Sequence, residues 1–462
     1  MKSIHQTISM VSLGFALLIF NPALAQVDAD SVMIRKIYTQ VLKDHTMDQN
    51  LRELVYKIGP RISGSAAAEQ TVVWAKSVME GYKPDRVYLQ PVTVPRWERG
   101  DTERAYFSAS GGKSRLDISA LGGSIPTDGI LQSEVVEVNS WKALADMTDA
   151  EIAGKFVFFN RAMDPTEVEV FKAYLKAVDQ RSLGAIAAAK RGAVGALIRS
   201  LTLSKDNVPH TGAVSYDEKV KKIPAVALST ISADRLSAAL KADPRMILSL
   251  ELKCRLLSPV RSNNVIAEIK GWEFPQEIVT LGAHLDSWDL GQGASDDGTG
   301  LVQSMEMLRV FNQLGFRPAR TVRVVLYMNE EAGAHGAVEY ARQATLNGEK
   351  HIAVMESDAG GFAARGFRVE AGSKALKQFR QWAKLFETYK AGDIQLEQRG
   401  IDLVPMKNKA LALISLDCDD SRLFDIHHSR LDTYDKINPR EVAMGAAAMS
   451  AMVLLISKYG LQ

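Results

Sequence analysis

Residues 278–286 read IVTLGAHLD, and this stretch decides the fold of the C-terminal half of the chain. Its apolar run has the length of a buried strand, and it ends at His284 and Asp286. Further strand-like runs occupy 265–269, 322–328 and 352–357, and helical patterns occupy 297–314 and 336–346. This alternation of strands and helices predicts an α/β sheet flanked by helices.

Acidic residues and histidine gather close to the ends of these apolar runs. The segments are GAHLD at 282–286, ASDDG at 294–298, NEE at 329–331 and ESD at 356–358. In an α/β sheet, ligands bind beyond the carboxyl ends of the strands. The placement of these polar residues therefore indicates a functional site.

His284 and Asp286 lie two residues apart on an extended segment, so their side chains point the same way. A carboxylate in that position can hold an imidazole in the tautomer that binds a metal. Taken alone, the pair is also compatible with unrelated surface residues. Asp296 and Asp297 are likewise compatible with simple capping of the helix that follows them.

Glu330 and Glu331 end an apolar strand, where neighbouring side chains point to opposite sides. One carboxylate can therefore bind a metal while the other takes a proton from water and returns it to a leaving amine. His335 lies four residues beyond Glu331, within reach on a helix, and is the rival metal ligand.

His427 and His428 are adjacent, and two adjacent histidines do not easily face one ion. One should bind the metal and the other should face the substrate. Two histidines and three carboxylates suit a pair of zinc ions that share one bridging carboxylate. A calcium site would be expected to contain no histidine.

The order of these motifs is specific. It runs His284-x-Asp286, Asp296-Asp297-x-x-Gly300, Glu330-Glu331, Asp358, and His428-Ser429 with Asp432-Thr433. This order resembles the zinc-dependent aminopeptidases of the M28 type. The double histidine at 427–428, together with Pro209-His210-Thr211-Gly212, most resembles the carboxypeptidase Q branch. The resemblance covers about 51–89, including Gly59-Pro60-Arg61, and 264 to the C-terminus. It implies a three-layer zinc exopeptidase fold with a mixed sheet.

The resemblance also implies which residues bind two zinc ions. Asp296 would bridge both ions, His284 and Asp358 would complete one, and Glu331 and His428 would complete the other.

The resemblance further implies the catalytic roles. Glu330 would be the general base, Asp286 would orient His284, and the peptide bond after Asp296 would be cis. His427 stands where many relatives have tyrosine, so it is the candidate to stabilise the oxyanion in place of a phenol.

A β-rich insert interrupts the peptidase pattern. Short strand-like runs at 130–138, 156–159, 196–198 and 225–228 surround one helix at 172–189. The insert resembles a protease-associated domain, and its residues alone indicate no chemistry. The expected boundaries are 1–25 for a signal peptide, 26–115 and 259–462 for the peptidase domain, and 116–258 for the insert.

The N-terminus has the pattern of a secretory signal peptide. Lys2 precedes an apolar stretch at 8–20, and Ala23 and Ala25 occupy the positions that a signal peptidase requires. We expect cleavage after Ala25 and export to the periplasm or the medium; an uncleaved anchor is the alternative. The apolar segment 443–456 is short enough for a buried core helix, so no stable membrane span is expected after cleavage.

The charge of the chain is nearly balanced, with 56 basic and 54 acidic residues, so nucleic acid is not expected as a partner. The sequence therefore predicts an exported metallo-exopeptidase that hydrolyses small peptides as an aminopeptidase or dipeptidase, and that could form homo-oligomers. Two alternatives remain open: a one-zinc enzyme of the glutaminyl cyclase kind, and a binding protein whose metal site is vestigial.

Overall fold

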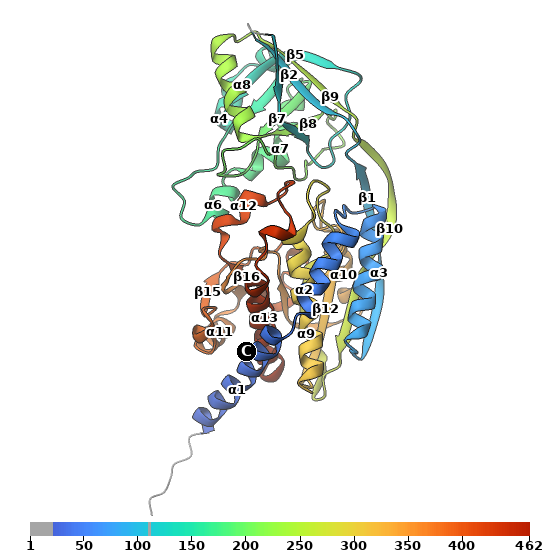
Figure 1. Cartoon of the computed structure of the whole chain (residues 1–462), viewed down its shortest axis with the longest axis vertical. Helices are drawn as coiled ribbons and strands as arrows, with labels where there is room; N and C mark the ends of the chain where they lie inside the picture. The colour runs from blue at the N-terminus through green and yellow to red at the C-terminus, as the bar shows by residue number, and fades with distance from the viewer. Residues whose placement is uncertain (1–21, 110–111) are drawn as a thin grey trace, which may run out of the picture.

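The computed structural model describes residues 22–109 and 112–462, which form two stacked units (Figure 1). Residues 1–21, which hold most of the predicted signal peptide, lie outside the described residues. The larger unit contains the N-terminal and C-terminal parts of the chain, and the smaller unit is inserted between them.

A mixed sheet of eight strands forms the centre of the larger unit. In spatial order its strands are β1 (Arg86–Glu98), β10 (Arg255–Ile269), β12 (Arg320–Tyr327), β11 (Phe274–His284), β13 (Lys350–Glu356), β16 (Ala410–Cys418), β14 (Ala364–Ala371) and β15 (Asp393–Leu396). The central strands β12, β11, β13 and β16 run parallel, whereas β1, β10 and β14 each run antiparallel to a neighbour. The predicted mixed sheet is confirmed.

Helices cover both faces of this sheet. On one face lie α1 (Pro22–Lys43), α2 (Thr46–Glu53), α3 (Ala66–Gly81), α9 (Gly300–Gln313) and α13 (Pro439–Tyr459), and on the other lies α10 (His335–Leu346). The strands alternate accordingly, because Val324 packs in the first core and Val325 in the second. The result is the expected three-layer arrangement.

Helix α13 begins where the sequence indicates. The side chain of Asn438 accepts a hydrogen bond from the backbone N–H of Arg440, and Pro439 occupies the first turn. Among the described helices, α13 alone is long and apolar enough to cross a membrane, and 83% of its most apolar window is buried. The helix therefore packs as part of the protein core, as its length predicted.

The inserted unit contains a second eight-stranded sheet. Its strands, in spatial order, are β3 (Gly112–Leu116), β2 (Glu103–Ala109), β9 (Ile247–Leu252), β5 (Leu131–Val138), β6 (Phe156–Phe159), β7 (Gly195–Arg199), β8 (Ala225–Leu228) and β4 (Ile118–Ala120). This sheet starts before residue 116, because β2 and β3 belong to it. The paired strands β1 and β10 carry the chain into and out of the unit.

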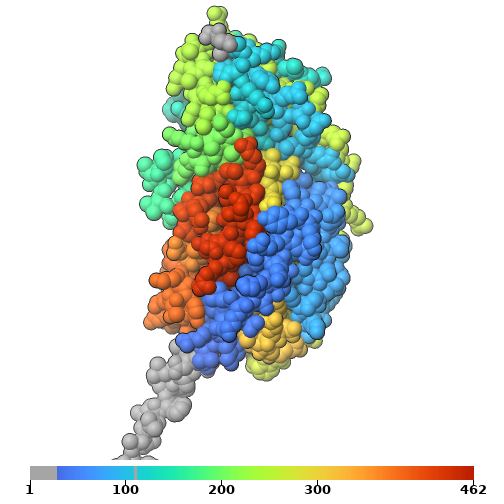
Figure 2. Space-filling view, viewed as in Figure 1, coloured from blue at the N-terminus to red at the C-terminus, as the bar shows by residue number. Residues whose placement is uncertain are grey.

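The helix expected at 172–189 is divided in two. Helix α6 (Val170–Leu175) ends before Ala177, which leaves the helical conformation at φ −121°, and α7 (Val178–Ala189) follows. The break lets α6 turn toward the larger unit, where Phe171 packs edge-on against Phe424 of α12 (Leu423–Ile426). The space-filling view shows the inserted unit seated directly on the C-terminal segments at this junction (Figure 2).

Candidate active site

Three neighbouring parallel strands deliver the first site residues to one edge of the sheet. His284 ends β11, where it lies beside Tyr327, the last residue of β12. Glu330 and Glu331 follow β12 closely, and Asp358 follows β13. The parallel register therefore brings together residues that the sequence had only placed after separate strands.

Asp296 and Asp297 reach the same edge from the turn Ala294–Thr299, which leads into α9. The peptide bond between them is cis, as the resemblance implied. The Asp297 carboxylate accepts hydrogen bonds from the backbone N–H groups of His284 and Gly300. The Asp297 side chain thus ties the turn to β11, while the Asp296 side chain is left free to face the histidines.

Asp432 holds the Asp296 turn from the opposite side. Its two carboxylate oxygens accept from the backbone N–H groups of Ser295 at 2.6 Å and Asp296 at 3.1 Å. Burial raises the pKa of Asp432 to about 7, although these backbone donors act in the opposite direction. Asp432 belongs to the sequence motif His428-Ser429 with Asp432-Thr433, and the structure shows which backbone groups it binds.

Asp296 lies between the two histidines predicted as ligands. Its Oδ1 is 3.2 Å from Nε2 of His284, and its Oδ2 is 3.2 Å from Nε2 of His428. Asp358 approaches His284 Nε2 at 3.6 Å, and Glu331 approaches His428 Nε2 at 3.1 Å. The five predicted ligands therefore form two clusters that share one carboxylate.

These spacings fit metal ions. Ligands about 2.0–2.1 Å from a tetrahedral zinc ion lie roughly 3.3–3.4 Å from one another, and the four separations found here, 3.1–3.6 Å, lie on either side of that value. Nε2 of His284 and Oε1 of Glu331 are buried without a hydrogen-bond partner, although both are strongly polar. The donor set also combines imidazole with carboxylate, which zinc accepts and calcium does not favour.

The negative charges of the buried carboxylates also favour the binding of cations at the site. Burial disfavours the protonated form of His428, but Glu331 and Asp296 outweigh it and raise the pKa of His428 to about 9. Burial also raises the pKa of Glu330, and Asp358 and Glu331 add to that shift while His284 opposes it. Several buried carboxylates thus compete for positive charge at one point.

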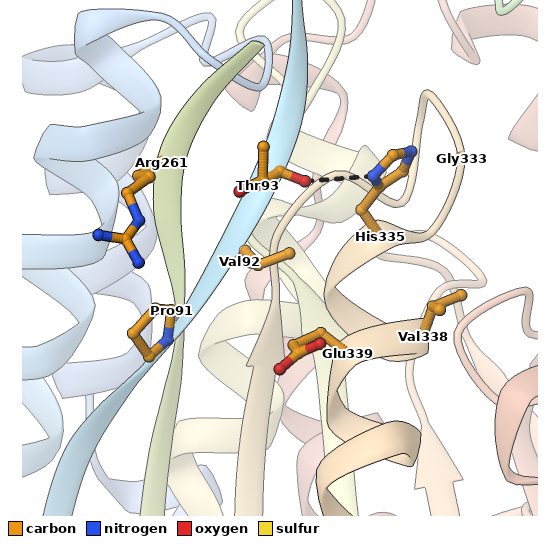
Figure 3. A pocket seen from close by; sticks show the side chains of 8 residues that line it. All are labelled: Pro91, Val92, Thr93, Arg261, Gly333, His335, Val338 and Glu339. Carbon is orange, nitrogen blue, oxygen red and sulfur yellow. Dashed lines mark hydrogen bonds between the residues drawn. The ribbon is translucent and has the colours of Figure 1, made fainter.

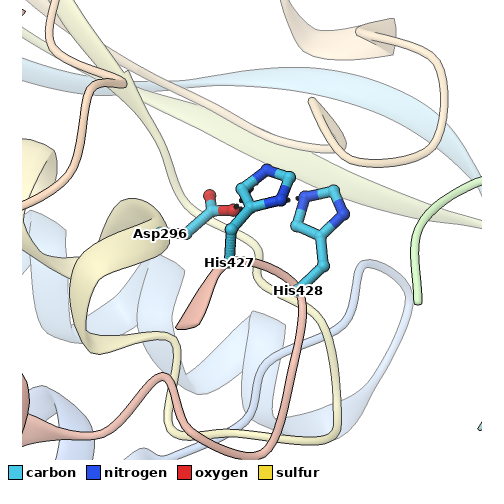
Figure 4. Close-up of side chains that lie close together, drawn as sticks. All are labelled: Asp296, His427 and His428. Carbon is cyan, nitrogen blue, oxygen red and sulfur yellow. Dashed lines mark ion pairs between the residues drawn. The ribbon is translucent and has the colours of Figure 1, made fainter. Parts of the chain in front are cut away.

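His427 lies within reach of the same site: Asp296, His427 and His428 form one of two groups whose ligand atoms lie within 4.8 Å of one another, and His284, Asp296 and Asp358 form the other. Its ring is stacked on that of His428, with centroids 3.6 Å apart, near Asp296 (Figure 4). Nε2 of His427 is 3.7 Å from Asp296, farther than that of His428, and no contact joins it to Glu331. Burial and the adjacent His428 lower the pKa of His427, which keeps this imidazole neutral.

Asp286 makes contacts that differ from the expected ones. Nδ1 of His284 bonds the backbone oxygen of Asp286 at 3.0 Å, whereas the nearer oxygen of the Asp286 carboxylate is 3.8 Å away. That oxygen instead accepts from the backbone N–H groups of Asn329 and Glu330. Asp286 therefore orients His284 through its main chain and positions the loop of Glu330 through its side chain.

The rival ligand His335 points away from the site. It is exposed, and its Nδ1 lies 3.2 Å from the backbone oxygen of Thr93 on strand β1 (Figure 3). It lines a surface pocket with Pro91, Arg261 and Glu339, outside the ligand cluster. Its spacing from Glu331 does not bring it to the metal site, because the helix starts at His335 itself.

The insert contributes residues that sequence reasoning missed. Nδ1 of His210 bonds the backbone oxygen of His427 at 2.7 Å, and the N–H of Thr211 donates to the backbone oxygen of His428. Arg181 Nη1 lies 3.3 Å from Nδ1 of His428. In the sequence, Pro209-His210-Thr211-Gly212 supported the family resemblance, but no contact with the site was predicted for it.

Arg61 stabilises the loop that carries part of the site. This side chain is fully buried and donates to the backbone oxygens of Leu285, Gln292 and Gly293, in the loop that joins His284 to Asp296. The Gly59-Pro60-Arg61 motif thus has a direct structural role.

A narrow cleft opens beside Asp358. The segment 414–422, which precedes the two histidines, supplies Ser415, Asp417 and Cys418 to its walls. Phe171 of the insert and Arg399 also line it. Cys254 and Cys418 are both free thiols.

Comparisons with known proteins identify the family of this chain. Residues 264–453 match the model of peptidase family M28. Carboxypeptidase Q of Bos taurus is 33% identical over 418 residues, which cover 88% of this chain and 84% of that protein.

Solved structures extend the likeness to both units. A peptidase M28 precursor from Shewanella amazonensis SB2B has a TM-score of 0.89 at 33% identity, over 94% of this chain and 99% of that chain. A zinc aminopeptidase from Bacillus subtilis shares the fold, with a TM-score of 0.64 at 21% identity, over 92% and 95% of the two chains. The chain therefore belongs to peptidase family M28 and is a metallopeptidase.

Proposed function

We propose that this chain is an exopeptidase that binds two zinc ions and hydrolyses small peptides. The observation that carries the proposal is Asp296, which presents one carboxylate oxygen to His284 and the other to His428. Asp358 would complete the first site and Glu331 the second. A bridging carboxylate between two half-sites suits a pair of ions with positions left for water and substrate.

Two zinc ions, when bound, supply Lewis acidity to the scissile carbonyl and lower the pKa of water to about 7. Glu330 is the residue that we propose takes a proton from the attacking water and returns it to the leaving amine nitrogen. The Asp286 carboxylate accepts hydrogen bonds from the backbone N–H groups of Asn329 and Glu330, which fixes the main chain at Glu330.

We propose small peptides as the substrates because the inserted unit closes one side of the site. His210 and Thr211 bond the main chain of both histidines, and Phe171 narrows the cleft beside Asp358. Carboxypeptidase Q and the zinc aminopeptidase are named for opposite ends of a peptide. A panel of free, N-blocked and C-blocked dipeptides, assayed with metal-depleted and zinc-restored enzyme, tests which end this chain requires.

The Glu330→Gln variant tests the assignment of the base. Glutamine keeps the size of the side chain but cannot accept the proton, so kcat should fall by roughly 10²–10⁴-fold. Zinc content should remain at two ions per chain, measured by mass spectrometry of metals. The matched variant Glu331→Gln should instead lose zinc. Near-wild-type turnover of Glu330→Gln would show that another group is the base.

The metal count also separates the proposal from its rivals. One zinc ion per chain together with cyclisation of N-terminal glutamine peptides would replace hydrolysis by acyl transfer. Bound zinc without cleavage of any peptide in the panel would indicate a binding protein.

We also propose that the chain is exported and that the insert is a protease-associated domain, predicted at 116–258. The pattern at 1–25 supports export, and N-terminal sequencing of the exported protein should begin at Gln26. The second sheet supports the insert, although its strands run from Glu103 to Leu252. These boundaries place the insert between the two long connecting strands.

A further inference from the structure

The oxyanion that forms during peptide hydrolysis needs a hydrogen-bond donor, and the His427 side chain is poorly placed to act as that donor. The His427 ring is stacked flat on His428, and its Nε2 faces Asp296. A neutral imidazole that directs one nitrogen toward a carboxylate has only the other nitrogen left for the substrate. The elements around His427 therefore contain the better candidates.

Tyr174 of the insert lies against this cluster. Its ring stacks on Phe424 with centroids 4.5 Å apart and meets His427 edge-on at 5.4 Å. Its hydroxyl is bonded to Arg181, which also approaches His428, so the phenol end of the ring lies toward a predicted ligand. Unlike the core aromatics, Tyr174 remains partly exposed. A phenol from another unit thus borders the site.

Arg181 fixes the direction of this phenol. Its Nη2 donates to the Tyr174 oxygen at 2.7 Å, and its Nη1 lies 3.3 Å from Nδ1 of His428. One guanidinium group therefore spans the distance between the phenol and a predicted metal ligand. Because the phenol oxygen accepts from Arg181, its own O–H is available to donate. Among the described residues, no acceptor lies within hydrogen-bond distance of that O–H.

We propose that Tyr174 is a catalytic residue whose hydroxyl donates a hydrogen bond to the oxygen that becomes negative when water adds to the scissile carbonyl, and that Arg181 is its positioning residue. The inference rests on the proposed peptidase function. The Tyr174 hydroxyl keeps its proton throughout: the water oxygen bonds to the carbonyl carbon, Glu330 takes the water proton, and the C–N bond breaks as the amine receives it. The cation of Arg181 strengthens the phenol as a donor, since it withdraws electron density from the oxygen.

The test compares Tyr174→Phe with Tyr216→Phe in the full, zinc-loaded chain. Tyr216 also lies in the insert, but its hydroxyl donates to the backbone oxygen of Ile223, away from the site. We expect Tyr174→Phe to lower kcat for a cleaved dipeptide by roughly 10²-fold with KM changed less than about threefold. Zinc content and the melting temperature should stay at the wild-type values, and Tyr216→Phe should match the wild type in kcat.

A second readout does not depend on turnover. A phosphinic dipeptide analogue carries a tetrahedral, charged centre, so calorimetry should show it bound more weakly by Tyr174→Phe, by a factor close to the loss in kcat/KM. Binding of a product amino acid should not change. If kcat and analogue affinity of Tyr174→Phe both stay within twofold of wild type, or if the loss follows from lost zinc or a lower melting temperature, the inference is wrong. If the wild type cleaves no peptide, the proposed function fails instead.

Discussion

Replacement of Arg61 by methionine should weaken both the fold and the metal site. The side chain is completely buried, and three backbone carbonyl groups depend on it: Leu285 at 2.8 Å, Gln292 at 3.1 Å and Gly293 at 2.9 Å. Methionine has a similar length and fills the space, but it donates no hydrogen bond. The substitution therefore isolates the lost donors from the loss of packing.

The magnitude follows from the groups left without partners. Each buried carbonyl without a donor costs about 1–3 kcal/mol, so three of them cost roughly 3–9 kcal/mol. The wild-type protein, however, carries the cost of burying a guanidinium ion, several kcal/mol, which the variant no longer has. We therefore expect Arg61→Met to lower the free energy of unfolding by about 3 kcal/mol. Because the same loop joins His284 to Asp296, zinc affinity should fall by roughly 10–100-fold.

Two measurements separate these effects. Urea unfolding with a chelator present gives the stability of the metal-free chain, and competition with a chromogenic chelator gives zinc affinity. Arg342→Met is the matched control, because Arg342 is exposed and pairs only with Glu339 on its own helix, so its unfolding midpoint should not move. If Arg61→Met unfolds within about 0.5 kcal/mol of the wild type and binds zinc equally well, Arg61 does not support the loop.

Two further predictions concern stability and the junction between the units. Burial opposes ionisation of Glu349, but hydrogen bonds from His351 and Arg323 prevail and lower its pKa to about 2. The pKa of glutamate in the unfolded chain is near 4.3, so the ionised Glu349 stabilises the folded chain above about pH 4.3. This stabilisation is lost as the pH falls to about 2. Glu349→Gln should therefore cost about 2 kcal/mol at pH 7 and almost nothing at pH 2, measured by urea unfolding across pH; an equal loss at both pH values would contradict this. A Cβ at Gly122 would lie 1.9 Å from the Trp288 ring of the other unit, so Gly122→Ala should destabilise the chain by about 1–3 kcal/mol and lower kcat. The control Gly81→Ala, which has open space around it, should change neither the stability nor kcat. Calorimetric melting and turnover measure both effects, and wild-type behaviour of Gly122→Ala would show that the two units are not tightly packed there.

The positions of three of the five predicted ligands could be inferred from local patterns in the sequence, whereas the ligand set itself came from the resemblance to the M28 family. His284, Glu331 and Asp358 follow apolar strands, and the parallel register of those strands then brings them together without further information. Their roles as ligands remain predictions, and the spacing of their atoms supports them. The same local reasoning kept His335 as a rival ligand, because it lies four residues beyond Glu331. Residues i and i+4 meet only inside a continuous helix, however, and here the helix starts at His335.

Contacts between distant segments had no such signal. The bond from His210 to the main chain of His427 spans 217 residues, and the contact of Arg181 with His428 spans 247. Tyr174 was read as part of one continuous helix, and only the break at Ala177 directs α6 toward the larger unit. Periodicity reports which face of a helix is apolar, but it does not report which distant surface that face meets.

These contacts change how the insert should be regarded. A separate domain would be expected to contact its neighbour through a polar interface that permits relative motion of the two domains. Here Trp288 packs on Gly122, and the insert donates one hydrogen bond, from Thr211, to the main chain of a predicted metal ligand. The residue bonded in this way, His428, has φ of +56°, a conformation that bulky side chains seldom adopt. Because such a conformation persists only where the surroundings hold it, the Thr211 bond to His428 makes the insert part of the predicted metal site.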